Sequence, residues 1–140
     1  MGSEMCIRDR YCTKQSEKHH YLTEEEFKKQ KFFEQTMYAG VKYGTKKEDI
    51  QGVLDEGKFV VMPLDMCGAI AMKRHFPTVI IYIAKDKEEM IADIVQSDFS
   101  VEEKTLRILS LDAEKRNREI CDVTADNRDG KGMERIVNLL

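Results

Sequence analysis

Residues 32–45 read FFEQTMYAGVKYGT, and this stretch decides how the rest of the chain is interpreted. Phe32–Met37 is typical of a strand and carries a single acid, Glu34. Gly40 supplies the backbone freedom for a turn, and Tyr43-Gly44-Thr45 follows it. The stretch therefore predicts a strand, a turn and a returning segment at Tyr43. Its acid, phenol and hydroxyl suit a small planar polar ligand that carries a phosphate.

The composition around this stretch is that of a globular domain. The chain has 140 residues, of which 41% are hydrophobic and 35% are charged, and its proline count is 2. A net charge of −3 disfavours a nucleic-acid-binding role, which usually needs a basic face. The longest apolar run, Thr78–Ala84, is far shorter than the roughly 20 residues of a membrane span. We therefore expect neither nucleic acid nor a membrane as a partner.

The first residues fit no pattern found further along the chain. MGSEMCIRDR lacks the apolar core of a secretory signal, and we interpret it as a cloning or sequence-assembly artefact. Residues 1–12 are accordingly set aside from fold reasoning as a leader. The 4 cysteines form no CxxC pair, which indicates reduced thiols in a cytoplasmic protein rather than a metal site.

Helix signals lie on both sides of the central stretch. Thr23 can cap a short helix that ends near Lys31, because Glu26 is correctly spaced for a capping box. After Thr45, residues Lys46–Glu56 show helical spacing of apolar side chains, and Gly57 is a typical terminating glycine.

Strands and helices alternate in the second half of the chain. Lys58–Leu64 and Thr78–Ala84 are apolar nearly throughout, which predicts strands buried on both faces. The turn Asp65–Gly68 and a helix ending at His75 lie between them. This order predicts an α/β fold with a parallel sheet. The remaining expected elements are helices at Lys87–Gln96, Val101–Arg118 and Lys131–Leu140, and a strand at Cys121–Ala125.

Taken in order, these segments resemble the guanylate kinase family. The resemblance implies an α/β fold, namely a partial P-loop nucleoside-monophosphate-kinase-like parallel sheet with an inserted small α/β acceptor-nucleotide domain. It assigns residues 13–57 to nucleoside-monophosphate binding and residues 58–140 to the remaining core, with a lid at about 96–100. The segments that carry it are Thr23–Phe27, Phe32–Glu34, Gly40, Tyr43–Thr45, Gly57-Lys58, Asp65–Gly68 and Phe76-Pro77.

Guanine chemistry agrees with the residue types at these positions. The base presents N1–H and an amine on one edge, which Glu34 can accept, and O6, to which Thr45 can donate. The resemblance implies that Asp65 also accepts from the amine, while Tyr43 can donate to the phosphate and Gly44 allows close backbone approach. Each residue also has an ordinary structural interpretation, such as a helix cap for Thr45 or Asp65.

Three further assignments depend on the resemblance alone. His19 falls where the family has a phosphate-binding tyrosine, and it could equally be a surface histidine. Arg107 lies next to the expected position of a catalytic arginine, although the predicted lid Gln96–Ser100 has no arginine of its own. Asn127 matches a position that contacts the adenine of ATP, and it could equally be a turn residue.

The donor side of the family pattern is not found in the sequence. No segment matches GxxxxGK[ST], the motif that holds ATP phosphates and Mg²⁺, and the sheet strand and helix around it are expected to be missing. We therefore expect a truncated guanylate kinase-like chain that binds GMP but not MgATP, and that is inactive alone. The alternative is a non-catalytic interaction module of the same family that binds a protein or phosphopeptide partner.

Overall fold

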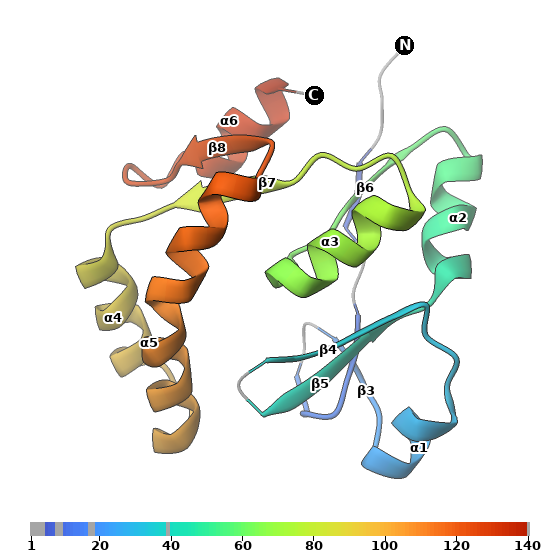
Figure 1. Ribbon diagram of the computed structural model, residues 1–140, viewed down its shortest axis with the longest axis horizontal. Coiled ribbons are helices and arrows are strands. Elements are labelled where there is room, and N and C mark those ends of the chain that lie inside the picture. Colours follow the sequence, from blue (N-terminus) through green and yellow to red (C-terminus); the bar gives the residue numbers. More distant parts are fainter. Residues whose placement is uncertain (1–4, 8–9, 17–18, 39, 140) are drawn as a thin grey trace. The chain divides into compact units, whose positions relative to one another are not determined.

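The computed structural model describes residues 5–7, 10–16, 19–38 and 40–139. The chain divides into two compact units, Met1–Met72 and Lys73–Leu140, and helix α3 (Met66–His75) runs across the boundary between them (Figure 1).

The first unit contains a sheet with the strand order β3-β2-β5-β4. Its strands are β2 (Tyr11–Cys12), β3 (His20–Tyr21), β4 (Glu34–Tyr38) and β5 (Val41–Thr45). β5 is antiparallel to both β4 and β2, whereas β2 and β3 are parallel. Gly40 lies in the β4–β5 connection with φ = 79°, which confirms the predicted turn glycine.

One face of this sheet is aromatic. The Phe32 ring lies 4.7 Å from the ring of Phe27 and 5.6 Å from that of Tyr11, measured between centroids. Phe27 comes from α1 (Glu24–Lys29) and is only 3% exposed. Phe32 also lies over Gly44, where a Cβ atom would come within 2.6 Å of the ring. Gly44 is therefore required by close packing on this face.

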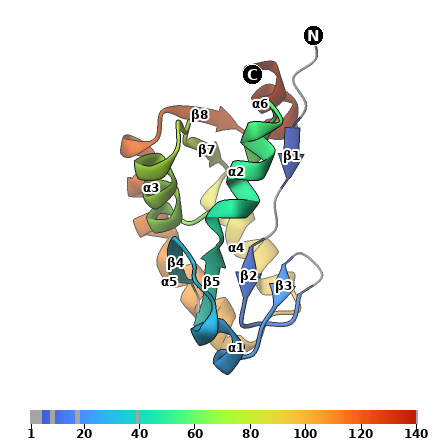
Figure 2. The same ribbon diagram turned by 90° about the vertical axis from the view of Figure 1, so that its right-hand side faces the viewer.

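Two helices adjoin the sheet, with α1 at one end and α2 (Lys47–Asp55) at the other (Figure 2). The predicted capping box of α1 is present, with Thr23 and Glu26 each bonded to the other's backbone N–H. α2 buries Ile50 and Val53, both 2% exposed, and leads to β6 (Phe59–Val61). Strand β1 (Met5–Ile7) pairs with β6 in parallel.

The second unit has a parallel pair of strands, β7 (Ile81–Ala84) and β8 (Val123–Asp126). Helices α4 (Lys87–Gln96) and α5 (Val101–Arg116) lie side by side between them in the chain (Figure 1). α5 continues as a 3-10 turn, Asn117–Ile120, and α6 (Gly132–Leu139) follows β8. None of the helices in the described part of the chain combines the length and apolar character needed to cross a bilayer.

The predicted order of helices and strands is confirmed, but the burial of two strands is not. Phe59 in β6 is 43% exposed and Ile83 in β7 is 42% exposed, so neither strand is buried on both faces. Burial of both faces requires other elements packed on each side of the sheet, and the exposure of Phe59 and Ile83 indicates that one face of each strand is not fully covered among the described residues. An apolar sequence alone does not reveal which faces will be covered.

The separation of residues 1–12 from the fold is also corrected. Met5–Ile7 forms β1, so β6 does have a parallel partner upstream, and Tyr11–Cys12 forms a central strand of the other sheet. Arg10, between them, is 3% exposed. These segments satisfy backbone groups of strands that would otherwise be unpaired. Whether the leader is an artefact stays a prediction.

Candidate functional site

The face of the four-stranded sheet opposite Phe32 is polar. In the register of β4 and β5, Glu34 lies directly across from Thr45, and Thr36 lies across from Tyr43. Because side chains alternate along a strand, these four residues share one face, and Gly44 belongs to the other. Two predicted base-reading residues, Glu34 and Thr45, thus lie together with Tyr43, the residue predicted to donate a hydrogen bond to the phosphate.

Arg10 occupies the centre of this polar face. Its Nη2 donates to Glu34 Oε1 at 2.6 Å and to Glu34 Oε2 at 2.5 Å. Its Nε donates to Thr45 Oγ1 at 3.1 Å, and the Thr45 hydroxyl donates to Glu34 Oε2 at 2.9 Å. The exposed fractions of Arg10, Glu34 and Thr45 are 3%, 4% and 3%. The three side chains form a buried, mutually satisfied polar cluster.

The two predicted phosphate-binding residues lie next to this cluster. The rings of His19 and Tyr43 meet edge to face with centroids 5.6 Å apart. The guanidinium carbon of Arg10 lies 5.4 Å from the centre of the Tyr43 ring, and the Arg10 backbone N–H donates to His19 Nδ1 at 3.4 Å. A phenol and an imidazole are thus close to one another, and both can donate to an anionic group.

Asp65 reaches the same region of the first unit through α3. Its Oδ1 accepts from the Gly68 N–H at 2.8 Å, so Asp65 does act as a helix cap. A Cβ atom on Gly68 would lie 3.2 Å from Glu34 Oε1 and 3.3 Å from Asp65 Oδ1. The two carboxylates therefore flank Gly68, as expected if both read the same edge of a base.

Arg107 lies on α5 of the second unit, where it contacts Glu103 and Phe99. Its Nε and Nη2 donate to Glu103 Oε1 at 3.1 and 3.0 Å, and its Cζ lies 4.1 Å from the centre of the Phe99 ring. Glu103 is 8% exposed. The arginine is thus held in one orientation by an acid and an aromatic ring.

Asn127 has a local structural role in the second unit. Its Oδ1 accepts from the N–H of Gly132 at 2.7 Å, which closes the loop between β8 and α6. In the same loop, hydrogen bonds from Arg128 lower the pKa of Asp126 to about 2. The ordinary interpretation as a turn residue accounts for these contacts, and an adenine contact stays a prediction.

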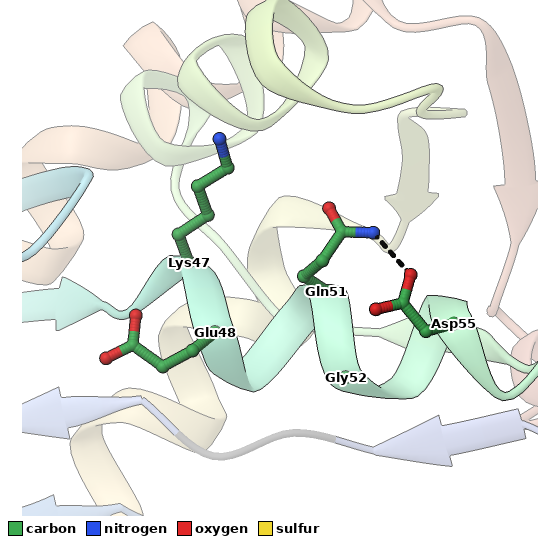
Figure 3. Close-up of a pocket in the computed structure, with 5 residues that line it drawn as sticks. All are labelled: Lys47, Glu48, Gln51, Gly52 and Asp55. Atoms are coloured by element: carbon green, nitrogen blue, oxygen red, sulfur yellow. Dashed lines mark hydrogen bonds between the residues drawn. The ribbon is translucent and has the colours of Figure 1, made fainter.

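Two other features of the structure do not add to the site. A shallow open hollow lies on the outer side of α2, where Gln51 Nε2 donates to Asp55 Oδ1 at 2.8 Å (Figure 3). It contains none of the predicted site residues. Within the described ranges, no group of three or more His, Cys, Asp or Glu side chains is arranged to hold a metal ion.

Sequence reasoning missed Arg10 and Thr36. A signal for Arg10 was nevertheless present, because a carboxylate expected in a buried ligand site needs a cationic partner when no ligand is bound. Arg10 is the nearest arginine upstream of Glu34. It lies within residues 1–12, which the sequence pattern separates from the fold.

Comparison with known proteins agrees with the resemblance seen in the sequence. The family model described as guanylate kinase matches residues 8–133. Guanylate kinases of Chlamydia trachomatis and Clostridium perfringens are 34% identical over 73 residues and 41% identical over 59 residues. These matches cover 49% and 39% of this chain but 36% and 27% of the relatives, so the chain spans only part of their length.

A solved structure supports the fold. The crystal structure of guanylate kinase from Anaplasma phagocytophilum matches with a TM-score of 0.75 at 19% identity. The match covers 96% of this chain and 73% of that one. The predicted fold class, an α/β fold of the P-loop nucleoside-monophosphate-kinase type, is thereby confirmed.

Proposed function

Since the chain belongs to the guanylate kinase family, we propose that its first unit binds GMP as the acceptor nucleotide. The observation that carries this proposal is the placement of Glu34 and Thr45 opposite each other on one buried face of β4 and β5. A carboxylate beside a hydroxyl provides an acceptor for guanine N1–H and amine and a donor for O6.

The surrounding residues support a monophosphate rather than a free base. Asp65 flanks Glu34 across Gly68 and adds a second acceptor for the amine. Tyr43 and His19 lie on the neighbouring part of the face and can donate to phosphate oxygens. Adenine fits poorly, because its unprotonated N1 would face the Glu34 carboxylate and leave buried polar groups unmatched.

The described residues do not fit MgATP. The closest approach to the donor motif is Gly52–Phe59, GVLDEGKF, with Phe59 where the motif needs Ser or Thr. It begins inside α2 and runs past its C-terminal end into β6. ATP phosphates need a loop that opens a helix, because the backbone N–H groups and the positive dipole lie at the helix N-terminus. Gly57-Lys58 lies at the opposite end.

Phosphoryl transfer from ATP to GMP, giving GDP and ADP, is accordingly proposed for the complete protein and not for this chain alone. By the resemblance, Arg107 is the candidate for a side chain that would meet the transferring phosphate. Its guanidinium is paired with Glu103 and lies against the Phe99 ring. A coupled GDP-formation assay is expected to detect no turnover by these 140 residues. Turnover by the chain itself would contradict the assignment of the donor site to another segment.

Calorimetric titration tests the GMP site directly. GMP is expected to bind and AMP is not. Thr45→Val removes the hydroxyl at nearly constant volume and should weaken GMP binding by about 1–3 kcal/mol, roughly 5- to 150-fold. Thr124→Val, on an exposed position of β8, makes the same chemical change as a control and should leave binding unchanged. Equal GMP affinity in the two variants would reject Thr45 as a base-reading residue.

A non-catalytic interaction module is the weaker proposal. A phosphopeptide could use Tyr43 and His19, but it has no need for a buried pair such as Glu34 and Thr45 beside Asp65. A chain that binds a phosphopeptide and gives no heat with GMP would favour the module instead.

A further inference from the structure

Two of the base-reading side chains of the proposed GMP site, Glu34 and Thr45, are committed to Arg10 and to each other. Glu34 uses both oxygens to accept from Arg10 Nη2, and its Oε2 also accepts from Thr45. The Thr45 hydroxyl has a single proton, which goes to Glu34, while its oxygen accepts from Arg10 Nε. Thr45 therefore has no donor left for guanine O6.

Because Glu34 and Thr45 are buried, no ligand can share their hydrogen bonds while Arg10 is in place. Glu34 is 4% exposed and Thr45 is 3% exposed, so a ligand arriving from solvent cannot reach either side chain in this arrangement. The Arg10 guanidinium lies on both of them and is itself 3% exposed. A base can reach the pair only after Arg10 has moved.

The guanidinium of Arg10 and the N1–H and amine edge of guanine are chemically similar. A guanidinium is a carbon bearing three nitrogens whose N–H groups form a planar fork. The N1–H and amine edge of guanine is the same N–C–N fork within a ring. Arg10 gives Glu34 both hydrogen bonds from one nitrogen, Nη2, whereas guanine would give them from N1 and its amine. Either partner satisfies the two oxygens of the carboxylate.

We propose that Arg10 is an internal competitor for the acceptor site: its guanidinium occupies the guanine-reading pair, and guanine nucleotides bind by displacing it. The inference rests on the proposed GMP site and adds a regulatory contact to it. Glu34 then stays paired in both states, with Arg10 when the site is closed and with the base when it is open. The affinity for GMP is lowered by the fraction of molecules in which the site is closed.

Calorimetry on two variants measures this competition. Arg10→Gln removes the guanidinium and keeps one amide donor for Glu34, and it should bind GMP at least tenfold tighter than the unaltered chain. Arg118→Gln makes the same change at an exposed position of the second unit, and its affinity should stay unchanged. GMP affinities of the Arg10 variant and the unaltered chain within twofold of each other would overturn the inference and leave the GMP site standing.

A second measurement uses the unaltered chain and does not depend on whether a variant folds. The Arg10 Nε–H, bonded to Thr45, is buried and should give a protected ¹⁵N–¹H signal, assigned by through-bond correlation to the Arg10 side chain. Saturating GMP should abolish or shift this signal, and AMP at the same concentration should not. A signal unmoved by bound GMP overturns the competition. An unaltered chain and Arg10 variants that all fail to bind GMP overturn the proposed function together with this inference.

Discussion

Replacing Gly44 by alanine tests the packing that holds the candidate site together. A Cβ atom at this position would lie 2.6 Å from Cγ and Cδ2 of Phe32 and 2.8 Å from its Cδ1. Carbon atoms pack at about 3.5–4.0 Å, so the ring must retreat by roughly 1 Å. It cannot retreat freely, because it also packs against Phe27, which is 3% exposed.

The size of the effect follows from two opposing contributions. Overpacking of this kind costs about 1–3 kcal/mol, and the contact with the rigid part of a ring places Gly44→Ala near the upper end. Reduced freedom of the unfolded chain offsets about 0.4–1 kcal/mol of that cost. We expect a net loss of about 2 kcal/mol in the free energy of unfolding, measured by urea denaturation followed by circular dichroism.

Gly52 provides a matched control for the same chemical change. It lies inside α2, where Figure 3 labels it, and a methyl group added to its Cα would meet no atom within 4 Å. Gly52→Ala should therefore stabilise the chain by about 0.8–1.0 kcal/mol, the helix-propensity difference. Phe32→Ala should remove the penalty of Gly44→Ala when the two are combined, because the ring is gone. Equal free energies of unfolding for Gly44→Ala and Gly52→Ala would refute the packing argument.

Two further predictions concern the second unit. Ser100→Ala removes the side-chain oxygen that accepts from the Glu103 N–H at 3.2 Å and should destabilise α5 by about 1 kcal/mol in the same urea assay, and no change would contradict the capping role. The Asp126 carboxyl should titrate with a pKa of about 2 by NMR because Arg128 donates to it. Its stabilising contribution should be complete above pH 4 and lost as the pH falls towards 2, and Asp126→Asn should lack that contribution.

The parts of the fold that could be predicted are those encoded within a few residues. The capping box at Thr23 and Glu26 and the turn at Gly40 are local signals, and both are present. The exposure of Phe59 and Ile83 could not be predicted in the same way. Whether a strand is covered on one face or on both depends on segments far away in sequence, and an apolar run is compatible with either.

The candidate site likewise combines features encoded locally with one contact that depends on a distant segment. Glu34, Tyr43 and Thr45 lie within one hairpin, whose strand, turn and returning segment the sequence predicted, and the register of β4 and β5 then places the three side chains on one face. Arg10 is separated from Glu34 by 24 residues and stands beside a two-residue strand, which has no periodicity to detect. Only the demand of a buried carboxylate for a cation connects the two in sequence, and that argument requires knowing that Glu34 is buried.

The alternation of side chains along β5 explains why a glycine stands between Tyr43 and Thr45. A strand has a period of two, so a slip of one residue in the pairing of β4 and β5 would carry both side chains to the aromatic face. It would also bring a side chain beneath Phe32, where only Gly44 leaves room. The ring thus excludes the slipped pairing by its volume. Packing of Gly44 against Phe32 on one face of the sheet thereby fixes Thr45 opposite Glu34 on the other.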